Sequence, residues 1–300
     1  MSNALSHEVI STPVLTVPVE ALESEKSPVF IRSATIATSN ARRLAEFYTR
    51  RLGFEQISAD AMSVTLGADG VGFLKLETRA DAEPFDARSS GLFHIAYLIP
   101  DRAGLARWFM AARAAGVAFE GASDHAVSEA FYLTDPEGNG IEVYVDRARE
   151  NWPRDAGGYA MTTGPMALRE LVVHSEAAAD MSPRLPTGTR IGHIHLQTGD
   201  AERSARFWQE RLGVAETHRR PGARFLSWGG YHHHIALNNW RSHGSGPRKD
   251  RSAGLVAVEF AVRGEAELEK LATQAHATRP DPASFDMIDP DGLELRFRVI

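Results

Sequence analysis

The chain has 300 residues, of which 43% are hydrophobic and 24% are charged, with a formal net charge of −6 and no cysteine. This composition is typical of a globular protein, excludes disulfides and thiolate ligands, and argues against a nucleic-acid-binding surface. No apolar run is long enough to span a membrane, and the first 28 residues lack a signal-peptide pattern. We therefore expect an N-terminal tail (1–28) and a cytoplasmic protein.

An internal repeat organises the rest of the chain. Residues 29–53 read as a strand followed by a helix that stops at a glycine, and residues 191–213 repeat this pattern. Two further units open at Gly91 and Gly254, and each carries an Asp-Pro-x-Gly turn. We expect modules of one strand, one helix and about three strands, at about 29–80, 90–147, 189–241 and 253–300.

The segment 121–146 predicts a strand, a turn and a second strand in which Glu142 stands among apolar residues. A single acid on a strand is usually exposed, and a single histidine on an apolar strand, such as His94, is usually a hydrogen-bonded core residue. Here Glu142 and His94 share a module with His125 and Tyr132. This combination favours a functional site over an exposed strand face and a core histidine.

Four motifs resemble the vicinal oxygen chelate superfamily, and within it the catechol 2,3-dioxygenase-like branch. They are GLFHIAYLIP (91–100), SDHAVSEAFYLTDPEGNGIEVYVDR (123–147), IGHIHL (191–196) and GGYHHHIALNNW (229–240). The resemblance implies an α+β fold in which four βαβββ modules pair into two half-open barrels around a divalent metal. We expect modules one and two at 29–147, a connector at 148–188 with a short helix at 166–175, and modules three and four at 189–300.

The resemblance also implies a metal site built from the first and last strands of the modules. Its ligand positions fall on His94, Glu142 and His193, whereas the equivalent positions elsewhere are occupied by non-ligands, namely Ser33, Ala257 and Arg296. Two histidines and one carboxylate suit Fe²⁺, with Mn²⁺, Zn²⁺ or Ni²⁺ as alternatives. The customary pairing of modules one with two and three with four leaves neither site complete. We therefore predict that module two pairs with module three, which would bring His193 within about 6 Å of Glu142, close enough to share one ion.

Further residues are candidates for acid–base chemistry beside the metal. In similar two-domain enzymes a tyrosine precedes the glutamate ligand as Tyr132 precedes Glu142, and His125 resembles a matching histidine. His195 shares a strand face with His193 and is a third candidate. The alternative for Tyr132 is a strand aromatic whose hydroxyl is simply satisfied.

The run His232-His233-His234 is a separate feature of the third module. Three consecutive residues on a strand cannot share a face, so either His233 points one way or His232 and His234 point the other. We expect His233 or His234 to line the pocket. An exposed strand end or a subunit contact is the alternative for the remaining residues.

Three functions follow from these expectations. The first is an extradiol dioxygenase that cleaves a catechol-like aromatic with O₂. The second is a glyoxalase-like isomerase or lyase, which a fourth ligand such as His233 would favour. The third is a small-molecule-binding protein without catalysis. The expected partners are a small aromatic substrate and O₂, with neither nucleic acid nor membrane, and a homo-oligomer is compatible with the sequence.

Overall fold

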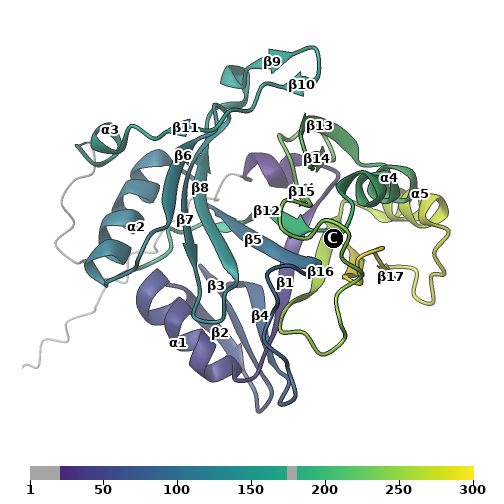
Figure 1. Ribbon diagram of the computed structural model, residues 1–300, viewed down its shortest axis with the longest axis horizontal. Coiled ribbons are helices and arrows are strands. Elements are labelled where there is room, and N and C mark those ends of the chain that lie inside the picture. The colour runs from purple at the N-terminus through teal and green to yellow at the C-terminus, as the bar shows by residue number, and fades with distance from the viewer. Residues whose placement is uncertain (1–20, 174–180) are drawn as a thin grey trace, which may run out of the picture.

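The computed structural model describes residues 21–173 and 181–300 (Figure 1). Its elements follow the four predicted modules. The first two modules comprise β1 (Val29–Thr38), α1 (Ala41–Leu52), β2 (Glu55–Ala59), β3 (Ser63–Ala68) and β4 (Val71–Thr78), then β5 (Gly91–Leu98), α2 (Arg102–Ala114), β6 (Gly121–Asp124), β7 (Ser128–Thr134) and β8 (Gly140–Asp146).

The last two modules comprise β12 (Arg190–Gln197), α4 (Ala201–Leu212), β13 (Ala215–Arg220), β14 (Ala223–Ser227) and β15 (Ile235–Asn238), then β16 (Gly254–Val262), α5 (Glu265–Ala275), β17 (Ser284–Ile288) and β18 (Glu294–Val299). Module four thus has two strands after its helix, where about three were expected. Among the described residues, no helix has the length and apolar character needed to cross a bilayer.

The strands of the four modules form two curled sheets, each shared by two modules. The seven-stranded sheet runs β17-β18-β16-β1-β4-β3-β2. The nine-stranded sheet runs β11-β6-β7-β8-β5-β12-β15-β14-β13, where β11 is the short strand Gly164–Pro165. β1 pairs antiparallel with β16, and β5 pairs antiparallel with β12. The predicted exchange is therefore confirmed: module two joins module three, and module one joins module four. The division into units at 29–147 and 189–300 stays a prediction.

The helices pair in a different order from the strands, because α1 contacts α2 and α4 contacts α5. These helix contacts connect the two sheets (Figure 1). The indole of Trp108 on α2 donates to the Leu52 carbonyl at the end of α1, at 2.9 Å. Gln274 on α5 donates to the Glu210 carbonyl on α4, at 3.0 Å. Modules one and two thus meet through helices, as do modules three and four, while their strands belong to different sheets.

Local sequence explains where these helices begin and end. The Asn40, Asp101 and Asp200 side chains accept backbone N–H groups at the first turns of α1, α2 and α4. Gly53 and Gly213 end α1 and α4 in the left-handed conformation, at φ 79° and 63°, which glycine adopts without the steric cost of a side chain. The predicted glycine stops of the repeat are confirmed.

The predicted connector contributes to the nine-stranded sheet. It contains η2 (Arg149–Asn151), β9 (Arg154–Asp155), β10 (Gly158–Tyr159), β11 (Gly164–Pro165) and α3 (Leu168–Val173). β11 pairs with β6 at the sheet edge. The helix expected at 166–175 corresponds to α3, and its last two residues lie outside the described residues. Of the predicted tail, residues 1–20 also lie outside them, and η1 (Glu23–Lys26) follows.

The Asp-Pro-x-Gly turns of modules two and four satisfy their aspartates differently. Asp135 accepts from the Tyr48 hydroxyl at 3.1 Å and from Asn139 Nδ2 at 2.8 Å. Asp289 accepts two backbone N–H groups of its own turn through Oδ1, but its buried Oδ2 has no partner in the described part of the chain. Burial raises the pKa of Asp289 to about 7.

Asp289→Asn should therefore become relatively more stable as the pH rises. Between about pH 4 and pH 7 the folded protein holds a proton on Asp289 that the unfolded chain has released. The contribution of Asp289 to the wild-type free energy of unfolding therefore falls through this window and levels off above about pH 7. We expect the variant to gain up to about 3 kcal/mol relative to wild type between pH 5 and pH 8. Urea unfolding at each pH measures this difference. The exposed Asp250→Asn is the control, and an equal response of both variants would contradict the prediction.

Candidate active site

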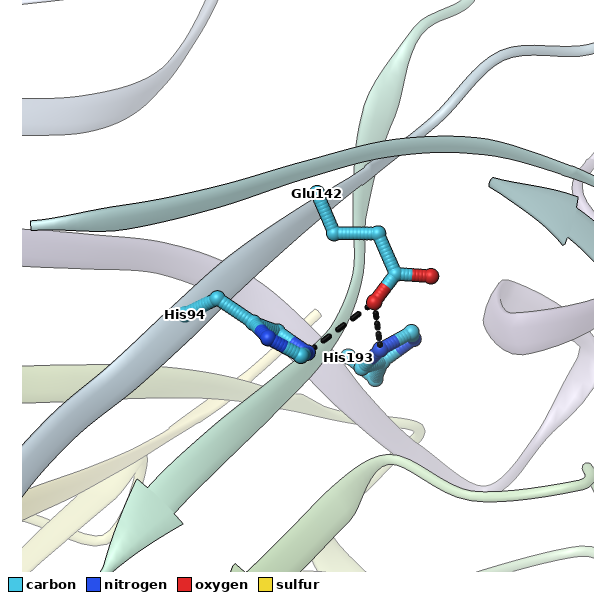
Figure 2. A group of neighbouring side chains, drawn as sticks. All are labelled: His94, Glu142 and His193. Atoms are coloured by element: carbon cyan, nitrogen blue, oxygen red, sulfur yellow. Dashed lines mark hydrogen bonds and ion pairs between the residues drawn. The ribbon is translucent and has the colours of Figure 1, made fainter. Parts of the chain in front are cut away.

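Three predicted ligand residues converge in the nine-stranded sheet. β5 carries His94 between β8, which carries Glu142, and β12, which carries His193. Glu142 Oε2 lies 2.9 Å from His94 Nε2 and 3.2 Å from His193 Nε2 (Figure 2). One ligand atom from each residue lies within 4.8 Å of the other two. The predicted approach of His193 to Glu142 is confirmed, and it follows directly from the pairing of β5 with β12.

This cluster is buried, with His94, Glu142 and His193 each at most 7% exposed. Burial by itself raises the pKa of Glu142, but contact with His193 and His94 outweighs it and holds that pKa well below its usual value. Burial lowers the pKa of His193 to about 4. Near pH 7 the carboxylate is therefore ionised beside a neutral imidazole. No lysine or arginine of the described chain lies within ion-pair distance of Glu142, so a bound cation would balance its charge.

The chemistry of these donors fits a divalent metal. His94 Nε2 is buried and, despite its short distance to Glu142, makes no hydrogen bond of acceptable geometry. An imidazole nitrogen without a hydrogen-bond partner beside an ionised carboxylate is an arrangement in which both groups can bind one metal ion. Two imidazoles and one carboxylate form the ligand set typical of non-haem Fe²⁺ sites.

The equivalent positions of the seven-stranded sheet carry no comparable set. Arg296 forms two hydrogen bonds to Glu294, at 2.8 and 2.9 Å, and Ala257 pairs with Thr35 across β1 and β16. Ser33 pairs with Glu259. Within residues 21–173 and 181–300, the His94 cluster is the one group of three metal-binding side chains.

A cavity of about 180 Å³ opens onto the cluster. Phe93, Phe225 and Trp240 supply aromatic wall, and Val127 and Met161 add apolar surface. A cavity of ~150 Å³ in another protein holds benzene, so this space suits one aromatic ring with small substituents.

His125 and Tyr132 form a hydrogen-bonded pair in the cavity wall. His125 Nδ1 lies 2.7 Å from the Thr162 carbonyl, which can only accept, so Nδ1 carries the proton. His125 Nε2 is then the acceptor for the Tyr132 hydroxyl at 2.6 Å. Burial and the charge of Glu142 raise the pKa of Tyr132 well above 10. Tyr132 is therefore a protonated donor, and His125 is held by its other nitrogen.

His195 also lies in the cavity wall, as its strand position predicted. Its ring centroid is 4.9 Å from that of His94 and 4.8 Å from that of Phe93. Asn238 Nδ2 lies 2.9 Å from His195 Nε2 and donates to it. Burial lowers the pKa of His195 well below its usual value. A neutral His195 thus closes the wall beside His94.

The histidine run differs from its predicted conformation. It lies in the turn before β15, so the expectation of three residues on a strand is wrong. His233 lines the cavity, with its ring 4.1 Å from that of His193. His234 faces away from the cavity and bonds the Ser24 carbonyl through Nε2 at 3.0 Å. Of the two residues expected at the pocket, His233 lines it and His234 does not, because the turn directs consecutive side chains to different neighbours.

A polar network holds this turn behind the cavity. His232 Nε2 donates to Asp146 Oδ1 at 2.7 Å, and the Tyr231 hydroxyl donates to Asp146 Oδ2 at 2.9 Å. His232 Nδ1 lies 2.7 Å from His233 Nδ1. One of these two nitrogens donates to the other, while the opposite ring nitrogen of His232 donates to Asp146. Asp146 is therefore connected to the cavity residue His233 through His232.

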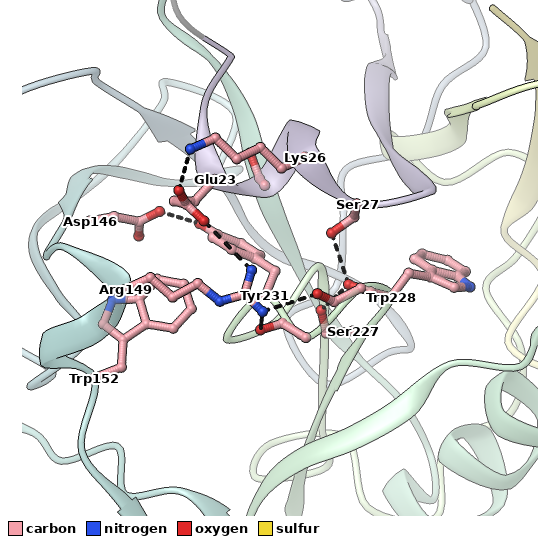
Figure 3. A network of polar contacts seen from close by, with 12 residues as sticks. Glu23, Lys26, Ser27, Asp146, Arg149, Trp152, Ser227, Trp228 and Tyr231 are labelled. Atoms are coloured by element: carbon pink, nitrogen blue, oxygen red, sulfur yellow. Dashed lines mark hydrogen bonds and ion pairs between the residues drawn. The ribbon is translucent and has the colours of Figure 1, made fainter.

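The N-terminal segment and η2 secure the same turn from outside (Figure 3). Ser27 Oγ donates to the Trp228 carbonyl at 2.9 Å. Arg149 donates to the Gly230 carbonyl at 2.8 Å and lies 3.7 Å from Glu23. The N-terminal segment and η2, which lie 201 and 81 residues from their partners in the sequence, thus hold the turn that carries His233.

Several cavity residues were missed by sequence reasoning. Met161 and Thr163 come from the connector, which was interpreted only as a link between modules, and Arg220 and Phe225 come from the β13–β14 hairpin. No motif marks these four. Trp240 belongs to a quoted motif, but nothing in that motif indicated that its ring faces the cavity.

Removal of a ligand should empty the proposed metal site. We expect His94→Ala and Glu142→Gln to lower the affinity for Fe²⁺ by more than about a hundredfold, because loss of an outer partner alone costs ten- to a hundredfold. Metal analysis after anaerobic loading measures this loss, and circular dichroism checks the fold. The exposed Glu265→Gln is the control. Stoichiometric metal in both ligand variants would contradict the assignment.

Comparisons with known proteins agree with this architecture. The profile of the Glyoxalase/Bleomycin resistance protein/Dioxygenase superfamily matches residues 31–143 and 190–296. The chain is 36% identical to a catechol-2,3-dioxygenase of Bacillus subtilis (strain 168) over 266 residues, which cover 86% of this chain and 92% of the relative.

Solved structures show the same fold. A dioxygenase candidate from Bacillus subtilis subsp. subtilis str. 168 has a TM-score of 0.60 and 11% identity, covering 90% of this chain and 84% of that one. Glyoxalase I from Zea mays has a TM-score of 0.53 and 14% identity, covering 92% of this chain and 94% of that one. From the profile match and the sequence relative together, the chain belongs to the glyoxalase/bleomycin resistance protein/dioxygenase superfamily.

Proposed function

We propose that this protein is a metal-dependent extradiol dioxygenase that opens a catechol-like ring with O₂. The observation that carries the proposal is the buried His94, Glu142 and His193 cluster at the end of an aromatic-walled cavity. The sequence relationship to a catechol-2,3-dioxygenase over most of both chains supports the same reaction.

Fe²⁺ is the metal we propose, held by His94, Glu142 and His193, with Mn²⁺, Zn²⁺ or Ni²⁺ as alternatives. When bound, Fe²⁺ supplies Lewis acidity toward the diol and an electron path between the ring and O₂. A set of three protein ligands leaves several positions of the ion open, as this chemistry requires. No fourth metal-binding side chain joins the cluster among the described residues, which favours the dioxygenase over the glyoxalase-like alternative.

His125 and Tyr132 are the residues we propose for proton transfer. A diol must lose protons to bind a metal as a chelate, and the ring-opened product must regain one. A substrate oxygen that accepts the Tyr132 hydroxyl frees His125 Nε2 to take a proton. The Thr162 carbonyl, which accepts from His125 Nδ1 at 2.7 Å, then stabilises the charged imidazole.

The remaining cavity residues orient the ring and exclude water. Phe93 and Trp240 pack edge to face, with centroids 5.7 Å apart, and His195 contacts both rings. His233 and His195 present neutral imidazoles because burial lowers the pKa of each well below its usual value. These two imidazoles therefore add no charge to the cavity wall beside the metal and the diol.

Oxygen consumption tests the reaction class. We expect Fe²⁺-loaded protein to consume one O₂ for each catechol and to place both atoms of ¹⁸O₂ in the product, which mass spectrometry measures. An isomerase incorporates neither atom. Turnover of a hemithioacetal with Ni²⁺ or Zn²⁺, without O₂ uptake on any catechol, would replace the proposal by the glyoxalase-like alternative.

Substitution of the proton-transfer pair should slow turnover without removing the metal. We expect His125→Ala to lower kcat by about a hundredfold or more, and Tyr132→Phe to lower it less, because the phenylalanine leaves the imidazole in place. Single-turnover rates and metal content measure the two effects. The exposed His276→Asn is the control. A wild-type rate for His125→Ala from pH 6 to pH 9 would remove His125 from the mechanism.

A further inference from the structure

The cavity is lined by Arg220, a permanently charged side chain, in addition to the carboxylate of Glu142. Arg220 ends β13 and lines the cavity, where its guanidinium contacts Thr163 and Met161 of the connector. Its charge lowers the pKa of the nearby Tyr132 hydroxyl against the larger effect of burial. A cation is therefore placed inside the cavity, in addition to the ligands that bind the metal.

The donors of Arg220 are only partly used by the protein. Nε donates to His218 Nε2 at 3.2 Å, one terminal nitrogen donates to Thr163 Oγ1 at 2.8 Å, and the other donates to the Met161 carbonyl at 2.9 Å. A guanidinium has five N–H groups. One N–H on each terminal nitrogen is thus left without a partner in the described part of the chain.

Arg220 differs from the other arginines of its hairpin. Arg219 lies 2.7 Å from Glu216, and Arg224 lies 3.5 Å from the same carboxylate. Across residues 21–173 and 181–300, no Asp or Glu lies within ion-pair distance of Arg220. Its hydrogen-bond partners are an imidazole, a hydroxyl and a carbonyl, which hold the guanidinium in place without a negative charge to balance it.

We propose that Arg220 binds an anionic group, such as a carboxylate, on the ring or short side chain of the substrate. Two N–H groups on adjacent terminal nitrogens match the two oxygens of a carboxylate. The cavity of about 180 Å³ limits the side chain to a few atoms beyond one ring. The assignment rests on the proposed ring cleavage and makes the substrate class catechol acids.

A second role for Arg220 is to clamp the connector against β13 through Thr163 and Met161. The two roles differ in what they predict for substrates of equal size. A clamp affects charged and neutral ligands alike, whereas an anion-binding group affects only the charged ligand. A carboxylated catechol and its primary amide therefore separate them.

The experiment compares 3,4-dihydroxyphenylacetate with its amide on four forms of the protein, namely wild type, Arg220→Gln, Arg220→Lys and Arg219→Gln. We expect wild type to prefer the acid, and Arg220→Gln to lose about tenfold to a hundredfold in kcat/KM for the acid with little change for the amide. Arg220→Lys should retain part of the preference because it keeps the charge and loses the fork. Arg219→Gln removes the same charge outside the cavity and should behave as wild type.

Binding without turnover provides a second readout. Dissociation constants for the acid and the amide, measured by calorimetry without O₂, should change with Arg220→Gln in the same proportion. Equal losses for acid and amide, or a wild-type preference for the amide, would overturn the proposal. If no catechol is cleaved by wild type, the proposed function fails, and the binding constants still decide whether Arg220 recognises the carboxylate.

Discussion

The antiparallel pairing of β5 with β12 is the constraint on which the site depends. It places His195 opposite His94 and brings His193 beside them from a different module. β8 then runs parallel to β5 on the other side and supplies Glu142. Side chains alternate along each strand, so three residues on three adjacent strands can face one cavity. Without this pairing, Glu142 would be buried beside a single imidazole.

Burial gives the cluster its chemical character. The same desolvation that lowers the pKa of His193 to about 4 keeps the imidazole neutral, while contact with both histidines keeps Glu142 ionised. A buried carboxylate without a cation is unfavourable, and this unbalanced charge is what a metal would neutralise. The cavity therefore combines a strongly polar end with aromatic walls, an arrangement typical of small-molecule sites.

The two sheets contribute differently to the site although both are built from modules of the same type. The nine-stranded sheet carries the candidate ligands, whereas Arg296 and Glu294 pair with each other at the equivalent place in the seven-stranded sheet. Helix contacts such as Trp108 to Leu52 connect the sheets, because the helices associate in a different order from the strands. The seven-stranded sheet thus supports the site through these helices without contributing a ligand to it.

Local periodicity and capping residues in the sequence determined the repeat and most of the helix and strand positions. The resemblance of four motifs to a known superfamily indicated the three ligand residues. Counting ligands also predicted the exchange of modules, which the strand pairing confirms. Only the tertiary structure decided that His233 faces the cavity while His234 contacts Ser24, and that Arg220 enters it beside Met161. These positions depend on the path of a turn and on contacts between distant segments, for which no local pattern in the sequence exists.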